Sequence, residues 1–210
     1  MAEVTQYFSN LPWLELMAML LALAYVVLAA NGSLWCWPAA FISTALYTII
    51  FYDVLLLMDS ALNLYYLVMA FYGYWIWQKK HPQVNYQKTS LEVISLPANK
   101  HLKIGITLAA ISLVLGYVMA NYTPAAFPYL DTFTTVFAIF ATYLVTQKVL
   151  ENWLYWLVID TVSIYLYLEK GLFPTAALFV IYIIIASYGY VKWYGFYKNN
   201  QLTLSAQISN

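Results

Sequence analysis

The chain alternates long apolar segments with short polar ones, and this pattern constrains its fold more than any other feature. A helix that spans a bilayer needs about 20 mostly apolar residues, with a range of roughly 17–25. Each apolar segment meets or nearly meets this length. We therefore predict seven transmembrane helices, over Trp13–Ala30, Trp35–Tyr52, Ser60–Trp77, Leu102–Asn121, Tyr129–Gln147, Asn152–Leu168 and Leu172–Trp193.

The composition supports an all-α integral membrane protein. Hydrophobic residues make up 64% of the chain and charged residues 9%, whereas a soluble domain carries about 25% charged residues. The net charge of zero argues against a nucleic-acid partner. Cys36 is the only cysteine, so no intrachain disulfide can form.

The lysines predict the orientation of the chain in the membrane. All nine basic residues are lysine. With an external amino terminus, Lys170 is the only one outside, which agrees with the excess of basic residues in cytoplasmic segments. The carboxyl terminus is then cytoplasmic. The lysines on the cytoplasmic side are Lys79, Lys80, Lys88, Lys100, Lys103, Lys148, Lys192 and Lys198.

An internal repeat organises the seven predicted helices. The segment "AFYGYWIW" at residues 70–77 matches "ASYGYVKW" at residues 186–193, an offset of 116 (186 minus 70). At this offset Trp37 corresponds to Trp153, so helices one to three resemble helices five to seven. The fourth helix returns the chain across the membrane, which gives a 3+1+3 parallel repeat typical of transporters. Gly73 and Gly189 also correspond, and small residues at such positions permit close helix packing.

The repeat predicts four sections of the chain. The segment after the second repeat is polar, and we expect it to be loosely ordered from Asn199 onward. The sections are 1–78 for the first three-helix repeat, 79–128 for a cytoplasmic loop and linker helix, 129–197 for the second repeat and 198–210 for a cytoplasmic tail.

A stripe of polar and aromatic residues follows one side of the sixth predicted helix. An aspartate at the bilayer centre costs about 2.5–3.5 kcal/mol on insertion scales unless it faces a cavity or a partner. We therefore predict that this face binds a flat ring that is polar or cationic. With helical periodicity, the stripe occupies an arc of about 100° and contains Asn152, Trp153, Trp156, Asp160, Ser163 and Tyr167.

The second and third helices carry further stripes. On the third helix the stripe is Asp59, Asn63, Tyr66, Ala70 and Tyr74, and on the second it is Cys36, Trp37, Ala40, Thr44, Tyr47 and Phe51. The second-helix stripe lacks an acid, so the predicted site is asymmetric. Asn63 alone could instead bridge two helices, a contribution of ~0.6 kcal/mol. Tryptophans near helix ends favour the membrane interface, which is the expected place of Trp13, Trp75, Trp77 and Trp193.

Three sequence blocks resemble the PnuC family of bacterial nicotinamide riboside transporters. They are "LWCWPAAFISTALYTIIFYD", "ALNLYYLVMAFYGYWIW" and "VLENWLYWLVIDTVSIYLYLEKGLFPTAALF", within a resemblance that spans about residues 14–193. Cys36 departs from the asparagine common in relatives. The resemblance implies a seven-helix SWEET-like fold in the inner membrane and a homotrimer. It further implies facilitated diffusion of nicotinamide riboside without a coupling ion or cofactor, which supplies NAD synthesis. The implied substrate contacts are Asn152, Trp153, Trp156 and Asp160, with Asn63 and Tyr66 facing them.

Other functions remain open on the residues alone. The same fold could carry thiamine, which also has a cationic ring, or another vitamin. An integral membrane enzyme is disfavoured, because His81 and His101 fall in the inner loop and no buried His, Asp and Glu cluster suits a metal or acid–base chemistry. A membrane scaffold would need no polar aromatic stripe. The expected partners are therefore nicotinamide riboside and membrane lipid.

Overall fold

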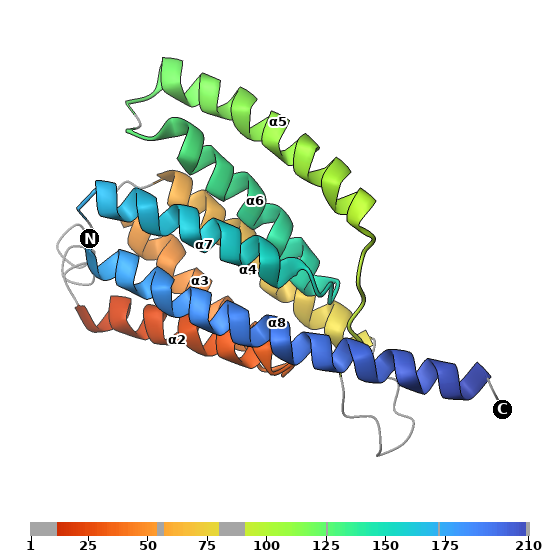
Figure 1. Ribbon diagram of the computed structural model, residues 1–210. Coiled ribbons are helices and arrows are strands. Elements are labelled where there is room, and N and C mark those ends of the chain that lie inside the picture. The colour runs from red at the N-terminus through yellow and green to blue at the C-terminus, as the bar shows by residue number, and fades with distance from the viewer. Residues whose placement is uncertain (1–11, 54–56, 80–90, 125, 172, 209–210) are drawn as a thin grey trace. The chain divides into compact units, whose positions relative to one another are not determined.

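The computed structural model describes residues 12–53, 57–79, 91–124, 126–171 and 173–208 (Figure 1). Over these residues the regular structure is helical, and an isolated parallel bridge joins Ile94 to Val149. Each helix covers one of the predicted spans, so the prediction of an all-helical chain is confirmed. The helices are α2 (Pro12–Ala30), α3 (Cys36–Asp53), α4 (Leu57–Lys79), α5 (Ala98–Tyr122), α6 (Pro128–Thr146), α7 (Asn152–Glu169) and α8 (Phe173–Ile208).

The helices form two compact units, residues 1–88 and 89–210. The first contains α2, α3 and α4, and the second contains α5 to α8. Within each unit a helix packs mainly on its neighbours in the sequence. Short connections favour this arrangement, because they return the chain directly along the helix it has just left.

The first unit is held by hydroxyl groups between apolar helices. Ser43 on α3 donates a hydrogen bond to the carbonyl oxygen of Ala18 on α2 at 2.8 Å. Ser60 on α4 donates to the carbonyl oxygen of Thr48 on α3 at 2.9 Å. Small hydroxyl side chains allow close approach of two helices and pair with backbone oxygens where water is scarce. These bonds make α3 the middle helix of the unit.

In the second unit α5 approaches α6 closely at Gly116. A Cβ atom at this position would lie 2.5 Å from Cδ1 of Tyr129, which no side chain could tolerate without a shift. Thr132 on α6 donates a hydrogen bond to the carbonyl oxygen of Ser112 on α5 at 3.0 Å. Pro128 begins α6, a position where its missing N–H removes no helical hydrogen bond.

The last helix is longer than predicted. The sequence predicts a span that ends at Trp193 and a loose tail from Asn199, but α8 continues from Phe173 to Ile208 over 36 residues (Figure 1). The prediction of a loose tail is therefore wrong. Polar residues end a membrane span, but they do not end a helix when no proline follows. The side chain of Asn200 also donates to the carbonyl oxygen of Leu91 at 3.0 Å, which ties the extension to the segment before α5.

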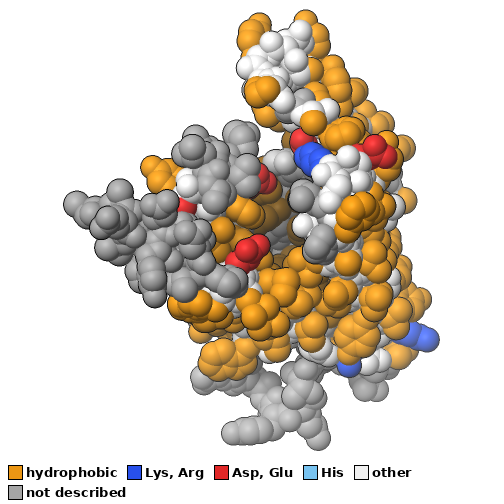
Figure 2. Space-filling view, turned by 90° about the vertical axis from the view of Figure 1, so that its left-hand side faces the viewer, with side chains coloured by type: hydrophobic (Ala, Val, Ile, Leu, Met, Phe, Trp, Pro, Cys, Tyr) orange, Lys and Arg blue, Asp and Glu red, His pale blue; other side chains and the backbone are white. Residues whose placement is uncertain are grey.

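The surface is strongly apolar, as expected for helices in contact with lipid. Figure 2 shows hydrophobic side chains over most of the described surface in that view, with few lysines. Among the described residues, four stretches are long and apolar enough to cross a bilayer: Trp13–Ala30, Ala98–Tyr122, Pro128–Thr146 and Thr175–Thr203. The predicted spans on α3, α4 and α7 are richer in tyrosine, tryptophan and polar side chains, which lowers their hydropathy.

Candidate binding site on helix α7

The polar stripe predicted on the sixth helix lies on α7, and most of it is buried. Asn152 is 0% exposed, Trp153 2%, Asp160 3% and Ser163 6%. A tight turn after α6 places Asn152 at the start of α7, and Lys148 in this turn has a left-handed φ of 59°. Such a conformation is uncommon for a residue other than glycine. The stripe thus has four polar or aromatic side chains in the interior of the protein.

Asn152 presents an unpaired acceptor. Its Nδ2 donates a hydrogen bond to the carbonyl oxygen of Val149 at 2.6 Å. Its Oδ1 is buried and has no hydrogen-bond partner. An unsatisfied buried acceptor costs roughly 1–3 kcal/mol, so a water or ligand that donates to this oxygen would be stabilised there.

Asp160 presents an unpaired carboxyl group two turns further along α7. No hydrogen bond or ion pair joins it, or Ser163, to another described residue. Burial of a carboxylate is costly without a partner. The position therefore favours a donor or a cation that arrives from outside the chain.

Trp156 lies between these two groups and offers an aromatic ring. It is partly exposed, and its ring makes no aromatic contact with another described residue. An indole face is a good surface for a cation or a flat ring. Of the two predicted tryptophans on this stripe, Trp156 has the ring that helix packing leaves available.

The ring of Trp153, by contrast, packs against α8. A Cβ atom at Gly189 would lie 2.7 Å from Cε2 of Trp153, so the indole covers this glycine. The ring also meets Trp193 edge-on, with centroids 5.5 Å apart and planes at 89°. Its Nε1 is buried without a hydrogen-bond partner. Trp153 can therefore donate a hydrogen bond, although its ring is engaged in packing.

The first unit contains the same tryptophan contact. A Cβ atom at Gly73 would lie 2.3 Å from Cη2 of Trp37. Trp37 meets Trp77 edge-on, with centroids 5.2 Å apart and planes at 90°, and its Nε1 is also buried without a partner. The prediction that Gly73 and its counterpart Gly189 permit close helix packing is confirmed.

These contacts correct one prediction about the membrane interface. Trp77 and Trp193 are 0% exposed, so they do not belong to an interfacial belt. The sequence places them near span ends, but each packs edge-on against the indole that covers the glycine of its helix pair. Trp13 and Trp75 are about half exposed, and their place at the membrane interface stays a prediction.

The remaining predicted site residues lie in the first unit and form local bonds. The Thr44 hydroxyl donates to the carbonyl oxygen of Ala40 on its own helix at 2.8 Å. Asn63 on α4 donates one amide hydrogen to the carbonyl oxygen of Asp59 on its own helix at 2.9 Å. Tyr66 lies beside Tyr65, with ring centroids 5.8 Å apart. That Asn63 and Tyr66 face α7 stays a prediction, because it concerns both units.

Comparison with known proteins identifies the family. A family model described as nicotinamide mononucleotide transporter matches residues 12–195. The chain belongs to this family. The resemblance to PnuC proteins inferred from the three sequence blocks is thereby confirmed, and the chain is a multi-pass membrane protein of a transporter family.

Several named relatives match this family member over most of its length. The nicotinamide riboside transporter PnuC of Escherichia coli (strain K12) is 25% identical over 208 residues, covering 88% of this chain and 86% of the relative. The PnuC protein of Neisseria mucosa is 26% identical over 190 residues, covering 86% and 72%. The riboflavin/roseoflavin transporter RibM of Streptomyces davaonensis is 24% identical over 184 residues, covering 87% and 84%.

A crystal structure of the vitamin B3 transporter PnuC has the same fold. It matches with a TM-score of 0.75 and 24% identity, covering 94% of this chain and 87% of that chain. Within the described residues of this nicotinamide mononucleotide transporter family member, no group of three or more His, Cys, Asp and Glu side chains could hold a metal ion.

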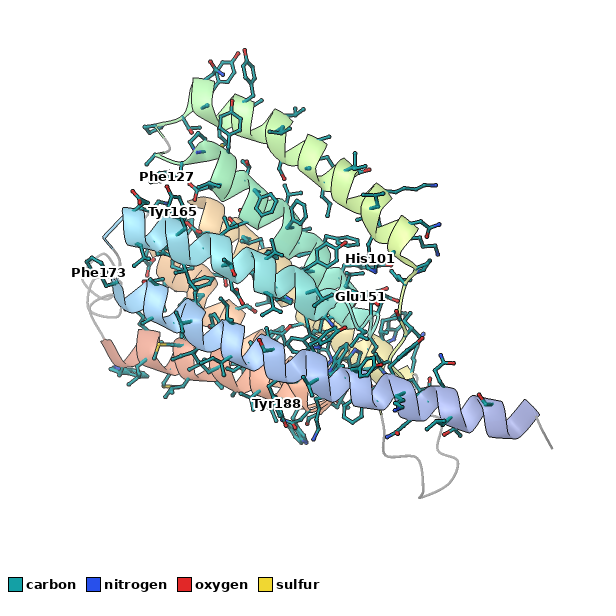
Figure 3. All side chains as sticks on the ribbon, viewed as in Figure 1. His101, Phe127, Glu151, Tyr165, Phe173 and Tyr188 are labelled. Atoms are coloured by element: carbon teal, nitrogen blue, oxygen red, sulfur yellow. The ribbon has the colours of Figure 1, made fainter. Side chains whose placement is uncertain are left out.

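Sequence reasoning missed a polar cluster at the start of α7. Glu151 precedes Asn152, and its carboxylate accepts hydrogen bonds from the Ser95 hydroxyl and from the backbone N–H of Leu96. His101 lies beside it, at the start of α5 (Figure 3). The sequence assigned His101 to a surface loop, but its side chain is only 18% exposed. The only signal was an acidic residue directly before the stripe, because the partners are about 50 residues away.

Proposed function

We propose that the protein carries nicotinamide riboside across the cytoplasmic membrane and thereby supplies NAD synthesis. The observation that supports this most is the match to PnuC relatives over 88% of the chain, together with unpaired buried groups on α7. A transporter must bind its cargo inside the membrane, and intramembrane polar residues mark such pathways. Like the family, the protein acts as a carrier and not as an enzyme.

In the proposed complex the pyridinium ring of nicotinamide riboside stacks on Trp156. A cation over an indole gains about 0.5–2 kcal/mol, more when water is excluded. Asn152 Oδ1 and Trp153 Nε1 then bind the carboxamide or ribose groups, and Asp160 balances the positive ring. Ser163 extends this surface along α7. Trp37, Thr44, Asn63 and Tyr66 of the first unit are further proposed contacts of the cargo.

The nucleoside is a better cargo than the mononucleotide for this surface. A phosphate group would add negative charge near Asp160. The chain has no arginine, and its lysines lie in connecting segments or at the edges of the predicted spans. Because α7 itself contains no lysine, a phosphate beside Asp160 would find no cation on that helix to neutralise it.

A second cargo class is supported by a specific relative. RibM of Streptomyces davaonensis, a riboflavin/roseoflavin transporter, matches 87% of this chain. Riboflavin offers a flat ring that could stack on Trp156, but its ring is neutral and leaves Asp160 without a cationic partner. Thiamine has a cationic ring and would satisfy both groups.

Uptake into proteoliposomes tests the cargo. Vesicles with the purified protein receive labelled nicotinamide riboside, nicotinamide mononucleotide, riboflavin or thiamine, and empty vesicles serve as control. We expect saturable uptake of nicotinamide riboside and none of the mononucleotide. Uptake of riboflavin alone would replace the proposal by the second class, and uptake of none would reject transport of these vitamins.

The proposed mode is facilitated diffusion. Asp160 is the one acidic side chain in the interior of α7, since Glu169 stands at the end of the helix, and a single central acid makes a poor proton relay. With equal substrate on both sides, neither a pH gradient nor a sodium gradient should drive accumulation in the vesicles. Net concentration by either gradient would reject uncoupled transport.

The proposed architecture is a 3+1+3 parallel repeat with an external amino terminus and a cytoplasmic carboxyl terminus, assembled as a homotrimer. The lysine asymmetry supports the orientation, and the matching tryptophan contacts support the repeat. A reporter active only in the cytoplasm, fused after Asn210, should be active. Native mass spectrometry of the purified protein should give three times the 24.1 kDa chain mass.

A further inference from the structure

The first turn of α7 is held by a group of polar side chains that do not belong to the proposed binding surface. Nδ1 of His101 lies 3.1 Å from the Tyr155 hydroxyl, and Nε2 lies 3.5 Å from Oε2 of Glu151. In the tautomer with hydrogen on Nε2, Nδ1 accepts from the hydroxyl and Nε2–H faces the carboxylate. One imidazole on α5 thus forms a hydrogen bond with Tyr155 in the first turn of α7, and its Nε2, which makes no hydrogen bond, lies at ion-pair distance from Glu151 directly before α7.

The two partners of His101 lie on one side of α7. Glu151 and Tyr155 are four residues apart and share a face, and so do Asn152 and Trp156. The second pair follows the first by one residue, so its face is turned by about 100° around the helix axis. Holding one face therefore sets the direction in which the other face points.

Further hydrogen bonds connect the segment before α5 to the start of α7. Glu151 also accepts hydrogen bonds from the Ser95 hydroxyl and from the backbone N–H of Leu96 at 3.2 Å. The adjacent backbone pairs with the turn before α7, since Ile94 N–H donates to Lys148 at 3.0 Å and Leu150 N–H donates to Ile94 at 2.8 Å. The segment before α5 is thereby fastened to the start of α7.

Aromatic rings on α6 lie beside the partly exposed ring of Tyr155. Its ring lies 5.5 Å from that of Phe140 in an edge-on contact and 6.3 Å from that of Phe137. The His101 ring is 5.7 Å from it on the side of α5. Among the described residues, the Tyr155 hydroxyl has one hydrogen-bond partner, Nδ1 of His101.

We propose that His101, Glu151 and Tyr155 are positioning residues for the binding surface of α7. They fix the rotation of its first turn and so place Asn152 and Trp156, without touching the cargo themselves. Ser95 supports Glu151 in this role. The identity of the cargo rests on the proposed function, whereas the contacts of His101, Glu151 and Tyr155 do not depend on it.

The test uses the full-length protein in proteoliposomes. The variants are Tyr155→Phe, His101→Gln, Glu151→Ala and Glu151→Gln. Matched controls on the same helix are Tyr165→Phe and Glu169→Gln, both at exposed positions without a polar contact to another described residue. KM and Vmax for nicotinamide riboside, the melting temperature, and hydrogen exchange of the first turn of α7 are measured for each.

Loss of positioning should raise KM about three- to tenfold in Tyr155→Phe, His101→Gln and Glu151→Ala, with Vmax per folded protein and melting temperature close to those of the unmodified protein. Exchange in the first turn of α7 should become faster. Glu151→Gln keeps an acceptor for Leu96 and should restore most of the affinity. The controls should change neither quantity.

Two results would overturn the proposal. One is a fall in melting temperature and Vmax with KM unchanged, which describes a purely structural role. The other is unchanged KM together with unchanged exchange in all variants. If the unmodified protein takes up no nicotinamide riboside, the proposed function fails, while the exchange measurement still decides whether this cluster holds α7.

Discussion

The two units contain the same tryptophan contact but differ in the polar groups around it. In each, an indole covers a glycine and meets a second tryptophan edge-on, at 5.2 Å for Trp37 and 5.5 Å for Trp153. Asn152, with an unpaired oxygen, takes the place of Cys36 at the offset of 116 residues.

A second difference lies eight residues further along each helix. Thr44 satisfies its own hydroxyl by a bond to the backbone of its helix, whereas Asp160, at the corresponding position, has no bonded partner among the described residues. The repeated parts are those that pack two helices together. The differing parts are those that can bind something else. The tryptophan contact is thus common to both units, whereas, among the described residues, the unpaired oxygen groups at these two positions occur only in the second unit.

The largest expected effect tests the difference between Asp160 and Thr44. Asp160→Asn keeps the size of the side chain and removes its charge, so affinity for nicotinamide riboside should fall about tenfold to a hundredfold, the value of ~1.5–3 kcal/mol for a charge-assisted bond. Thr44→Val at the corresponding position should change it much less. Calorimetric titration of both variants measures the difference, and melting temperatures control for folding. Equal effects would show that both halves share the binding chemistry.

The matched glycine contacts predict similar losses of stability in the two units. A methyl group at Gly73 or Gly189 would overlap the indole of Trp37 or Trp153, and such overpacking costs about 1–3 kcal/mol. Both alanine variants should therefore melt at a lower temperature. Gly105→Ala is the control, because nothing lies within 4 Å of a Cβ there, and it should melt no lower than the unmodified protein. A lower melting temperature in only one of the two variants would show that the two glycine contacts are not equivalent.

Trp156 has no aromatic counterpart in the first unit, where Ala40 occupies the corresponding position. Trp156→Ala tests whether this ring binds the cargo. Removal of the stacking surface should weaken binding about five- to thirtyfold, equivalent to ~1–2 kcal/mol. The control is Trp13→Ala, which removes a half-exposed indole on α2. Unchanged affinity in Trp156→Ala would remove this ring from the site.

The smallest effect concerns the far end of α7. Lys170 lies 3.3 Å from Asp131 on α6, and their side chains are 30% and 37% exposed. Exposed pairs contribute about 0.2–1 kcal/mol, so Asp131→Asn should lower the melting temperature slightly. High salt should remove the difference between the two proteins. A large fall in melting temperature that persists at high salt would contradict this prediction.

The sequence predicted the helices well because a bilayer requires long apolar segments of limited length. It also grouped Asn152, Trp156 and Asp160, because helical periodicity places them on one face. Their burial or partial burial in one unit agrees with that grouping. That they bind the cargo stays a prediction.

Other features depend on contacts between distant parts of the chain. The periodicity of α7 cannot tell that the face of Trp153 is occupied, because Gly189 lies 36 residues later (189 minus 153). The partners of Glu151 lie 55 and 56 residues earlier in the sequence. The end of α8 was missed for another reason. The polarity of the sequence indicates where a membrane span ends, but the helix can continue beyond the span for as long as its residues favour helix.

Helix α8 is longer than a bilayer core is thick. At a rise of 1.5 Å per residue, its 36 residues measure about 54 Å, compared with roughly 30 Å for the hydrocarbon core of a bilayer. Any tilt that begins where α8 meets Trp153 is magnified at its far end. A fluorescent probe attached at the exposed position Gln201 would report such a displacement.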